Sequence, residues 1–225
     1  MIYVENDTLI IRLPDVHPNA GVAIDLQRTL RLPDDGVEHH LPPGFGSFPL
    51  RHIEDYDLGA NNALKSRGGL IMPMFQADAL WLNFNPYEGD HDLPEYPMAI
   101  RIAAGKVCAL TGDVWAEGLK EAPQNYAVIP DQPWLDGFNV GKGVVRQFVA
   151  APLGDGVTVE EQLKGTADVG GIQIQVFPMK REVFEKLGSQ GFGRLPEVLY
   201  CNMESSFIGL GAGGRMQQEV YDDEH

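Results

Sequence analysis

The chain has 225 residues, of which 44% are hydrophobic and 22% charged, proportions typical of a globular protein. Its net charge of -15, from 17 basic and 32 acidic residues, disfavours partners such as nucleic acid and anionic membrane surfaces. The first residues show no signal-peptide pattern, and no window is apolar enough to span a bilayer. Cys108 and Cys201 have no metal or redox spacing, so we expect free thiols and a cytoplasmic location.

The first half of the chain is dominated by strand patterns. Residues 8–13 predict a short strand that ends at Pro14, and residues 22–32 alternate apolar and polar side chains with only Arg28 interrupting the apolar face. A proline, two aspartates and a glycine at 33–36 then predict a turn. Residues 41–49 contain three prolines and two glycines, which predicts an ordered connector rather than a regular element.

Strand patterns continue to residue 180. Residues 79–84 alternate in the same way, and 98–110 predict a hairpin that turns at Ala104-Gly105-Lys106. Further strands are predicted within 126–130, 143–150 and 170–180. The helical patterns are too short to form the crossover helices that connect parallel strands. The sequence therefore predicts a mainly β fold class. We expect a sandwich or barrel of short, largely antiparallel strands.

Two short helices are predicted, and a third short one fits within residues 60–69. Thr158 followed three residues later by Glu161 forms a capping-box pattern at the start of the first. The second covers residues 180–187 and ends at Gly188. The sequence therefore predicts one β-rich domain over residues 1–188, followed by a glycine-rich, acidic arm or linker over 189–225.

That arm contains GLGAGG at residues 209–214, a match to the dinucleotide-binding pattern G-x-G-x-x-G. The pattern requires a complete βαβ unit and an acidic residue about 20 positions later. Only residues 215–225 follow here, too few for either. We therefore interpret the glycines as part of a flexible or docking arm, with an anion-binding loop beside Arg215 as the alternative.

The densest group of metal-ligand types lies just after the first predicted turn. It comprises Asp34, Asp35, Glu38, His39 and His40. Carboxylate and imidazole groups that converge at a turn can hold a divalent cation. Adjacent histidines on an extended segment point to opposite faces, however, so an exposed polar loop is the competing interpretation. A divalent cation is the one cofactor that the sequence leaves open.

A second candidate site lies where dense turn chemistry frames a polar strand between residues 131 and 165. Its predicted ligand-binding residues are Trp134, Asp136, Arg146, Gln147 and Glu161. An aromatic ring, two carboxylates, an amide and a guanidinium could together orient a small polar ligand, whose identity the sequence does not give. Acids that cap helices and turns are the competing interpretation.

Several stretches resemble a family of uncharacterised, mostly bacterial proteins. They are LQRTLRLPDDG, LPPGFGSFPLRHIEDY, GGLIMPMFQADALWLNF, QPWLDG, RQFVAAPLGDGVTVEEQ and GGIQIQVFPMK. The resemblance covers roughly residues 26–180 and implies no activity and no catalytic residue. It also suggests that the arm is a linker or docking segment.

The sequence favours a binding or self-assembling structural module over an enzyme. Nucleophile elbows, P-loops and metalloprotease motifs are all missing from it. Strand edges and a glycine-rich arm make strand addition between copies of the chain physically easy, so its partner is expected to be itself. The alternative is a hydrolase or lyase that uses carboxylates, with or without a divalent cation.

Overall fold

The computed structural model describes residues 1–33, 35, 37–40, 42–57, 63–87, 95–141, 144–167, 169–189 and 215–217. The strands are β1 (Ile2–Glu5), β2 (Thr8–Arg12), β3 (Gly21–Thr29), β4 (Glu38–His40), β5 (Arg51–His52), β6 (Leu70–Ile71), β7 (Ala79–Pro86), β8 (Met98–Ala104), β9 (Val107–Cys108), β10 (Ala127–Ile129), β11 (Trp134–Leu135), β12 (Gly137–Gly141), β13 (Val144–Val149), β14 (Ile172–Pro178) and β15 (Arg215–Gln217). The helices are the 3-10 turn η1 (Ile53–Asp55), α1 (Ala63–Arg67), α2 (Val159–Lys164) and α3 (Arg181–Ser189).

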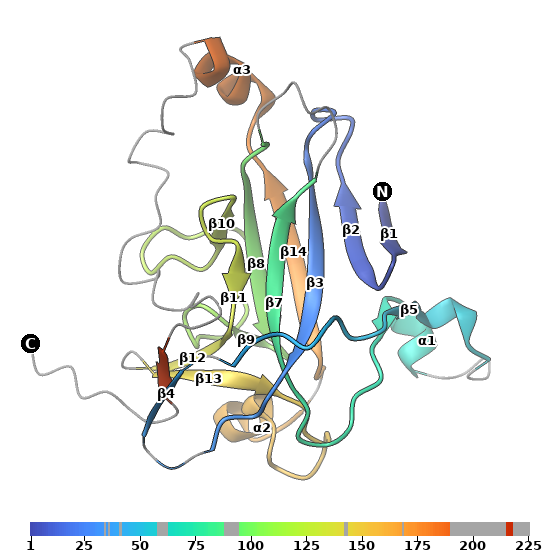
Figure 1. The fold of residues 1–225 in the computed structure, drawn as a ribbon, viewed down its shortest axis with the longest axis vertical. Helices are drawn as coiled ribbons and strands as arrows, with labels where there is room; N and C mark the ends of the chain where they lie inside the picture. Colours follow the sequence, from blue (N-terminus) through green and yellow to red (C-terminus); the bar gives the residue numbers. More distant parts are fainter. Residues whose placement is uncertain are drawn as a thin grey trace, which may run out of the picture.

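The prediction of a mainly β, sandwich-like fold is confirmed. A seven-stranded sheet has the order β1-β2-β3-β7-β13-β12, with β11 also paired to β7, and a four-stranded sheet has the order β10-β8-β14, with β9 paired to β8. Every strand pair in the described chain is antiparallel. These described strands form open sheets that face each other rather than a closed barrel (Figure 1).

The core lies between the two sheets because the alternation of each strand turns one row of side chains inward. Ile24 on β3, Phe84 on β7 and Ile100 on β8 are all completely buried in this one apolar cluster. Arg28, which interrupts the apolar row of β3, is exposed and places its guanidinium carbon 4.5 Å from the ring centre of Phe48. Its cation therefore covers a core aromatic ring from outside.

The predicted hairpin over residues 98–110 is present as β8 and β9. Its turn glycine, Gly105, has a φ of 58°, a backbone conformation that residues with a side chain rarely adopt. The β1–β2 hairpin was not predicted; Asn6 and Asp7 form its two-residue turn, with φ values of 50° and 63°. An Asn-Asp pair between two apolar segments is a signal that could have identified it.

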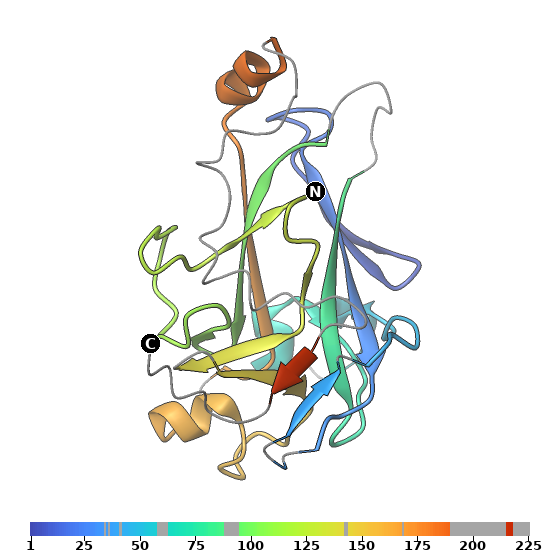
Figure 2. The same cartoon turned by 60° about the vertical axis from the view of Figure 1, so that its left-hand side comes forward.

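The two longer helices occupy opposite ends of the sandwich, α3 at one end of the long axis and α2 at the other, as both views show (Figures 1 and 2). At α2, Thr158 accepts a hydrogen bond from the amide of Glu161, and the Glu161 side chain accepts one in return, so the predicted capping box is confirmed. The helix ends at Gly165, whose φ is 78°. Neither end carries a helix long and apolar enough to cross a membrane within the described chain.

Candidate functional site

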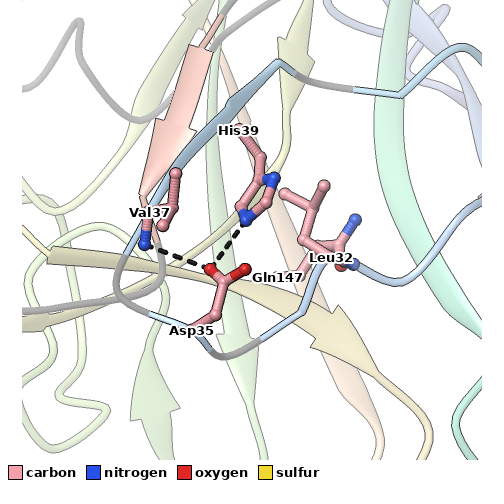
Figure 3. Close-up of polar contacts among 5 residues, drawn as sticks. All are labelled: Leu32, Asp35, Val37, His39 and Gln147. Carbon is pink, nitrogen blue, oxygen red and sulfur yellow. Dashed lines mark hydrogen bonds and ion pairs between the residues drawn. The ribbon is translucent and has the colours of Figure 1, made fainter.

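The predicted metal-ligand group lies at the turn into β4, where two of its members contact each other (Figure 3). His39 Nε2 lies 2.8 Å from Asp35 Oδ1, and the same oxygen accepts a hydrogen bond from the Val37 amide at 3.1 Å. These contacts, first with the His39 ring and then with the Val37 amide, lower the pKa of Asp35. The pair therefore fixes the turn that leads into β4.

The positions of the other three side chains in that group are not described. Asp34 lies outside the described residues, and the side chains of Glu38 and His40 are not described. Among the described residues no group of three or more metal-ligand side chains is close enough to hold an ion. The metal site over residues 34–40 stays a prediction.

Gln147, one of the five predicted ligand-binding residues, connects two parts of the backbone. Its Oε1 accepts a hydrogen bond from the Leu32 amide, and its Nε2 donates one to the Leu30 carbonyl, both at 2.9 Å. Figure 3 shows its side chain directed toward Leu32. Because a strand partner would make the same two bonds, this buried amide attaches the segment after β3 to β13 in place of a ladder.

Trp134, Asp136 and Arg146 lie near Gln147 along neighbouring strands. Gly137 pairs with Gln147 and Phe138 with Arg146, so Asp136 directly precedes the strand that runs beside β13, whereas Trp134 pairs with Asn83 of β7. Asp136 is completely buried. Arg146 and Gln147 are consecutive in a strand and therefore point to opposite faces of the sheet. The fold brings these residues close in space without directing all of them toward one ligand.

Glu161, the fifth predicted ligand-binding residue, belongs to the capping box at the N-terminus of α2. One carboxylate oxygen accepts from the Gly154 amide at 2.8 Å, and the other accepts from the amide and hydroxyl of Thr158 at 3.1 and 2.7 Å. These bonds, above all that from the Thr158 hydroxyl, lower the pKa of Glu161. A low pKa keeps the group ionised as an acceptor, which suits a cap and not a general acid. The ligand-binding role of the five residues stays a prediction.

The neighbouring Glu160, which is not one of the five predicted ligand-binding residues, is almost completely buried. Its Oε2 accepts hydrogen bonds from the amides of Val169 and Gly170, at 3.3 and 2.9 Å. The space beside Gly105 is filled by this side chain. Glu160 therefore connects α2 to the turn after β8 and to the segment just before β14.

A buried group of three aromatic rings, which was not predicted from the sequence, lies at the α3 end of the sandwich. The rings of His17, Tyr96 and Phe184 contact one another with centroid separations of 4.3 to 4.9 Å. His17 Nδ1 accepts a hydrogen bond from the Asn19 amide at 3.1 Å, which requires a nitrogen without a proton. Burial is the largest cause that lowers the pKa of His17.

One open cavity of about 390 Å³ lies between the β1–β2 turn and β5. Asp7 and Arg51 form an ion pair at 2.5 Å on its wall, and the Asp7 carboxylate also accepts from the Leu50 amide at 3.3 Å. The bond from Arg51 is the largest cause that lowers the pKa of Asp7. These contacts attach the hairpin turn to Leu50 and Arg51, and they leave the Asp7 carboxylate paired with the Arg51 guanidinium.

The strand edges carry the remaining candidate surface. Residues 215–217 of the arm form β15, which pairs antiparallel with β4 so that Met216 lies opposite His39. Figure 2 shows this short ribbon at the same end of the molecule as β12 and β13. The GLGAGG stretch at 209–214 lies outside the described residues, as does Cys201, whereas Cys108 is a free, buried thiol as predicted.

Comparison with family models, with curated proteins and with solved structures finds no match for this chain. The resemblance to an uncharacterised bacterial family therefore stays a prediction.

Proposed function

We propose that this protein is a structural module that binds or self-assembles by adding strands to the edges of its sheets. The observation that carries the proposal is the β4–β15 ribbon. A segment at residues 215–217 adds a strand to one at 38–40, far away along the sequence. Strand addition needs only backbone groups on both sides, so the same chemistry is available to a segment of another molecule.

The polar groups of the predicted site support a structural role. Gln147 and Glu161 direct their hydrogen-bonding atoms to backbone groups of their own chain. Asp35 and His39 bind each other. Side chains used in this way hold segments in place, and open strand edges are then the surfaces left to make contacts with a partner.

Native mass spectrometry of the full chain, over about 1 to about 100 µM, tests the proposal. We expect a defined oligomer of the 24.7 kDa chain whose population rises with concentration. A monomer throughout this range, with no added mass, would contradict self-assembly. A monomer that carries a stoichiometric metal or small molecule would instead support the carboxylate-based hydrolase or lyase.

A further inference from the structure

We infer that the open edge of β14 is the surface by which two copies of this chain pair, antiparallel and about a twofold axis. This inference rests on the proposed function and names the edge, the partner and the register. Within the described chain β14 is the last strand of its sheet and pairs with β8 alone. Its inward-facing Ile174 and Val176 are half-buried, whereas Ile100 and Ile102 of β8 are completely buried.

The hydrogen-bonding pattern shows which backbone groups face the open edge. The Gly105 amide donates to the Gly171 carbonyl at 2.8 Å, and the Met179 amide donates to the Pro97 carbonyl at 3.0 Å. The register between β14 and β8 is regular from one end to the other. Since bonded and non-bonded pairs alternate in an antiparallel ladder, the odd-numbered residues of β14 bond to β8 and the even-numbered ones point away from it.

The groups that point away belong to Ile172, Ile174, Val176 and Pro178. Among described backbone groups none donates to or accepts from them. Pro178 has no N–H, and proline is tolerated in a strand only where that donor would face an edge, which agrees with the assignment. Ile172, Ile174 and Val176 thus present three amides and three carbonyls to any strand that approaches.

Features that normally protect an edge strand are missing from β14. Its sequence, IQIQVFP, has no charged residue, and its proline is at the very end. The register shows no bulge, in contrast to the irregularity between β12 and β13. A regular, uncharged edge of β-branched and aromatic residues is a surface that pairs with another strand unless it is covered.

A second copy of the same strand fits this edge. With a twofold axis at Ile174, Ile174 pairs with its own copy and Ile172 pairs with Val176 of the other chain, so all their open amides and carbonyls are satisfied. Pro178 then lies outside the bonded pairs. The core-facing side places apolar beside apolar residues, and the outer side places Gln173 opposite Gln175. The seam contains no charge, although each chain carries a net charge of -15.

Two double variants that differ at one position test this register. In Q173E/Q175E like charges lie opposite each other across the seam, whereas in Q173K/Q175E opposite charges do. Glu at 175 keeps an acceptor for Arg101, whose Nη1 lies 3.0 Å from Gln175 Oε1. We expect light scattering to show a dimer for the wild type and for Q173K/Q175E. For Q173E/Q175E we expect roughly a tenfold or greater increase in dimer Kd.

Amide hydrogen exchange on the wild type gives a second measurement that needs no variant. The Ile174 and Val176 amides should exchange slowly at high concentration and fast on dilution, while the Gln173 and Gln175 amides, bonded to β8, stay protected at both. If the wild type assembles but both variants assemble equally well and the Ile174 amide stays unprotected, the β14 assignment is wrong and the proposed function stands. If the wild type is a monomer, both are wrong.

Discussion

Replacement of Gln147 by leucine should destabilise the fold well beyond the usual effect of a surface change. Leucine fills similar volume but offers neither the acceptor for the Leu32 amide nor the donor for the Leu30 carbonyl. The Leu32 amide is buried, and an orphaned buried group costs about 1–3 kcal/mol. The Leu30 carbonyl is only partly buried, so water can replace its bond and the added cost is below about 1 kcal/mol. Together these give a loss of about 1–4 kcal/mol in the free energy of unfolding.

Urea denaturation of the wild type and of Gln147→Leu measures this loss. Gln162→Leu is a matched control, because the Gln162 amide makes an exposed bond to the Val157 carbonyl at 3.1 Å and its loss should cost less than about 0.5 kcal/mol. If both variants unfold at the same urea concentration as the wild type, then Gln147 does not hold the segment after β3, and the structural interpretation of this residue is refuted.

Three further predictions concern the two ends of the sandwich. Thr158→Ala removes the α2 cap and should lower the free energy of unfolding by about 1 kcal/mol in urea titrations, and an unchanged midpoint would contradict the capping box. Gly105→Ala places a methyl group against Glu160 at positive φ and should cost at least about 2 kcal/mol by the same assay. Gly156→Ala, at a φ of 73° in open space, isolates the backbone part, and equal losses would argue against the clash. The lowered pKa of His17 means that its neutral form is stabilised in the fold, so stability from this group is intact above about pH 6.5 and falls as pH drops toward the folded-state pKa. Thermal unfolding at about pH 7.5 and about pH 5 should therefore show a smaller acid loss for His17→Phe than for the wild type, and equal losses would exclude His17 as the cause.

The sequence determined the elements whose signals are local. Alternation identified β3 and β7, because a strand with one face in the core must place its apolar side chains at every second position. The capping box at Thr158 and the turn at Gly105 were equally readable, since each depends on residues only a few positions apart.

Residue type alone did not show what the polar side chains bind. Gln147 and Glu161 were predicted as ligand-binding residues because amides and carboxylates commonly serve that purpose. Their partners here are backbone groups, and the Leu30 and Leu32 groups that Gln147 contacts lie more than 100 positions away. Contacts between residues so far apart in the sequence depend on the order of the strands in the sheet, which the periodicity of one strand does not encode.

The open edge of β14 depends on the same distinction. Its composition, IQIQVFP, is a property of the sequence, and it would read the same in a central strand. The tertiary structure places β14 at the end of its sheet, beside β8 and no other described strand. An edge exists only where a neighbouring strand is missing, so local sequence determines what the strand can pair with, and the assembled sheet determines whether that side is available.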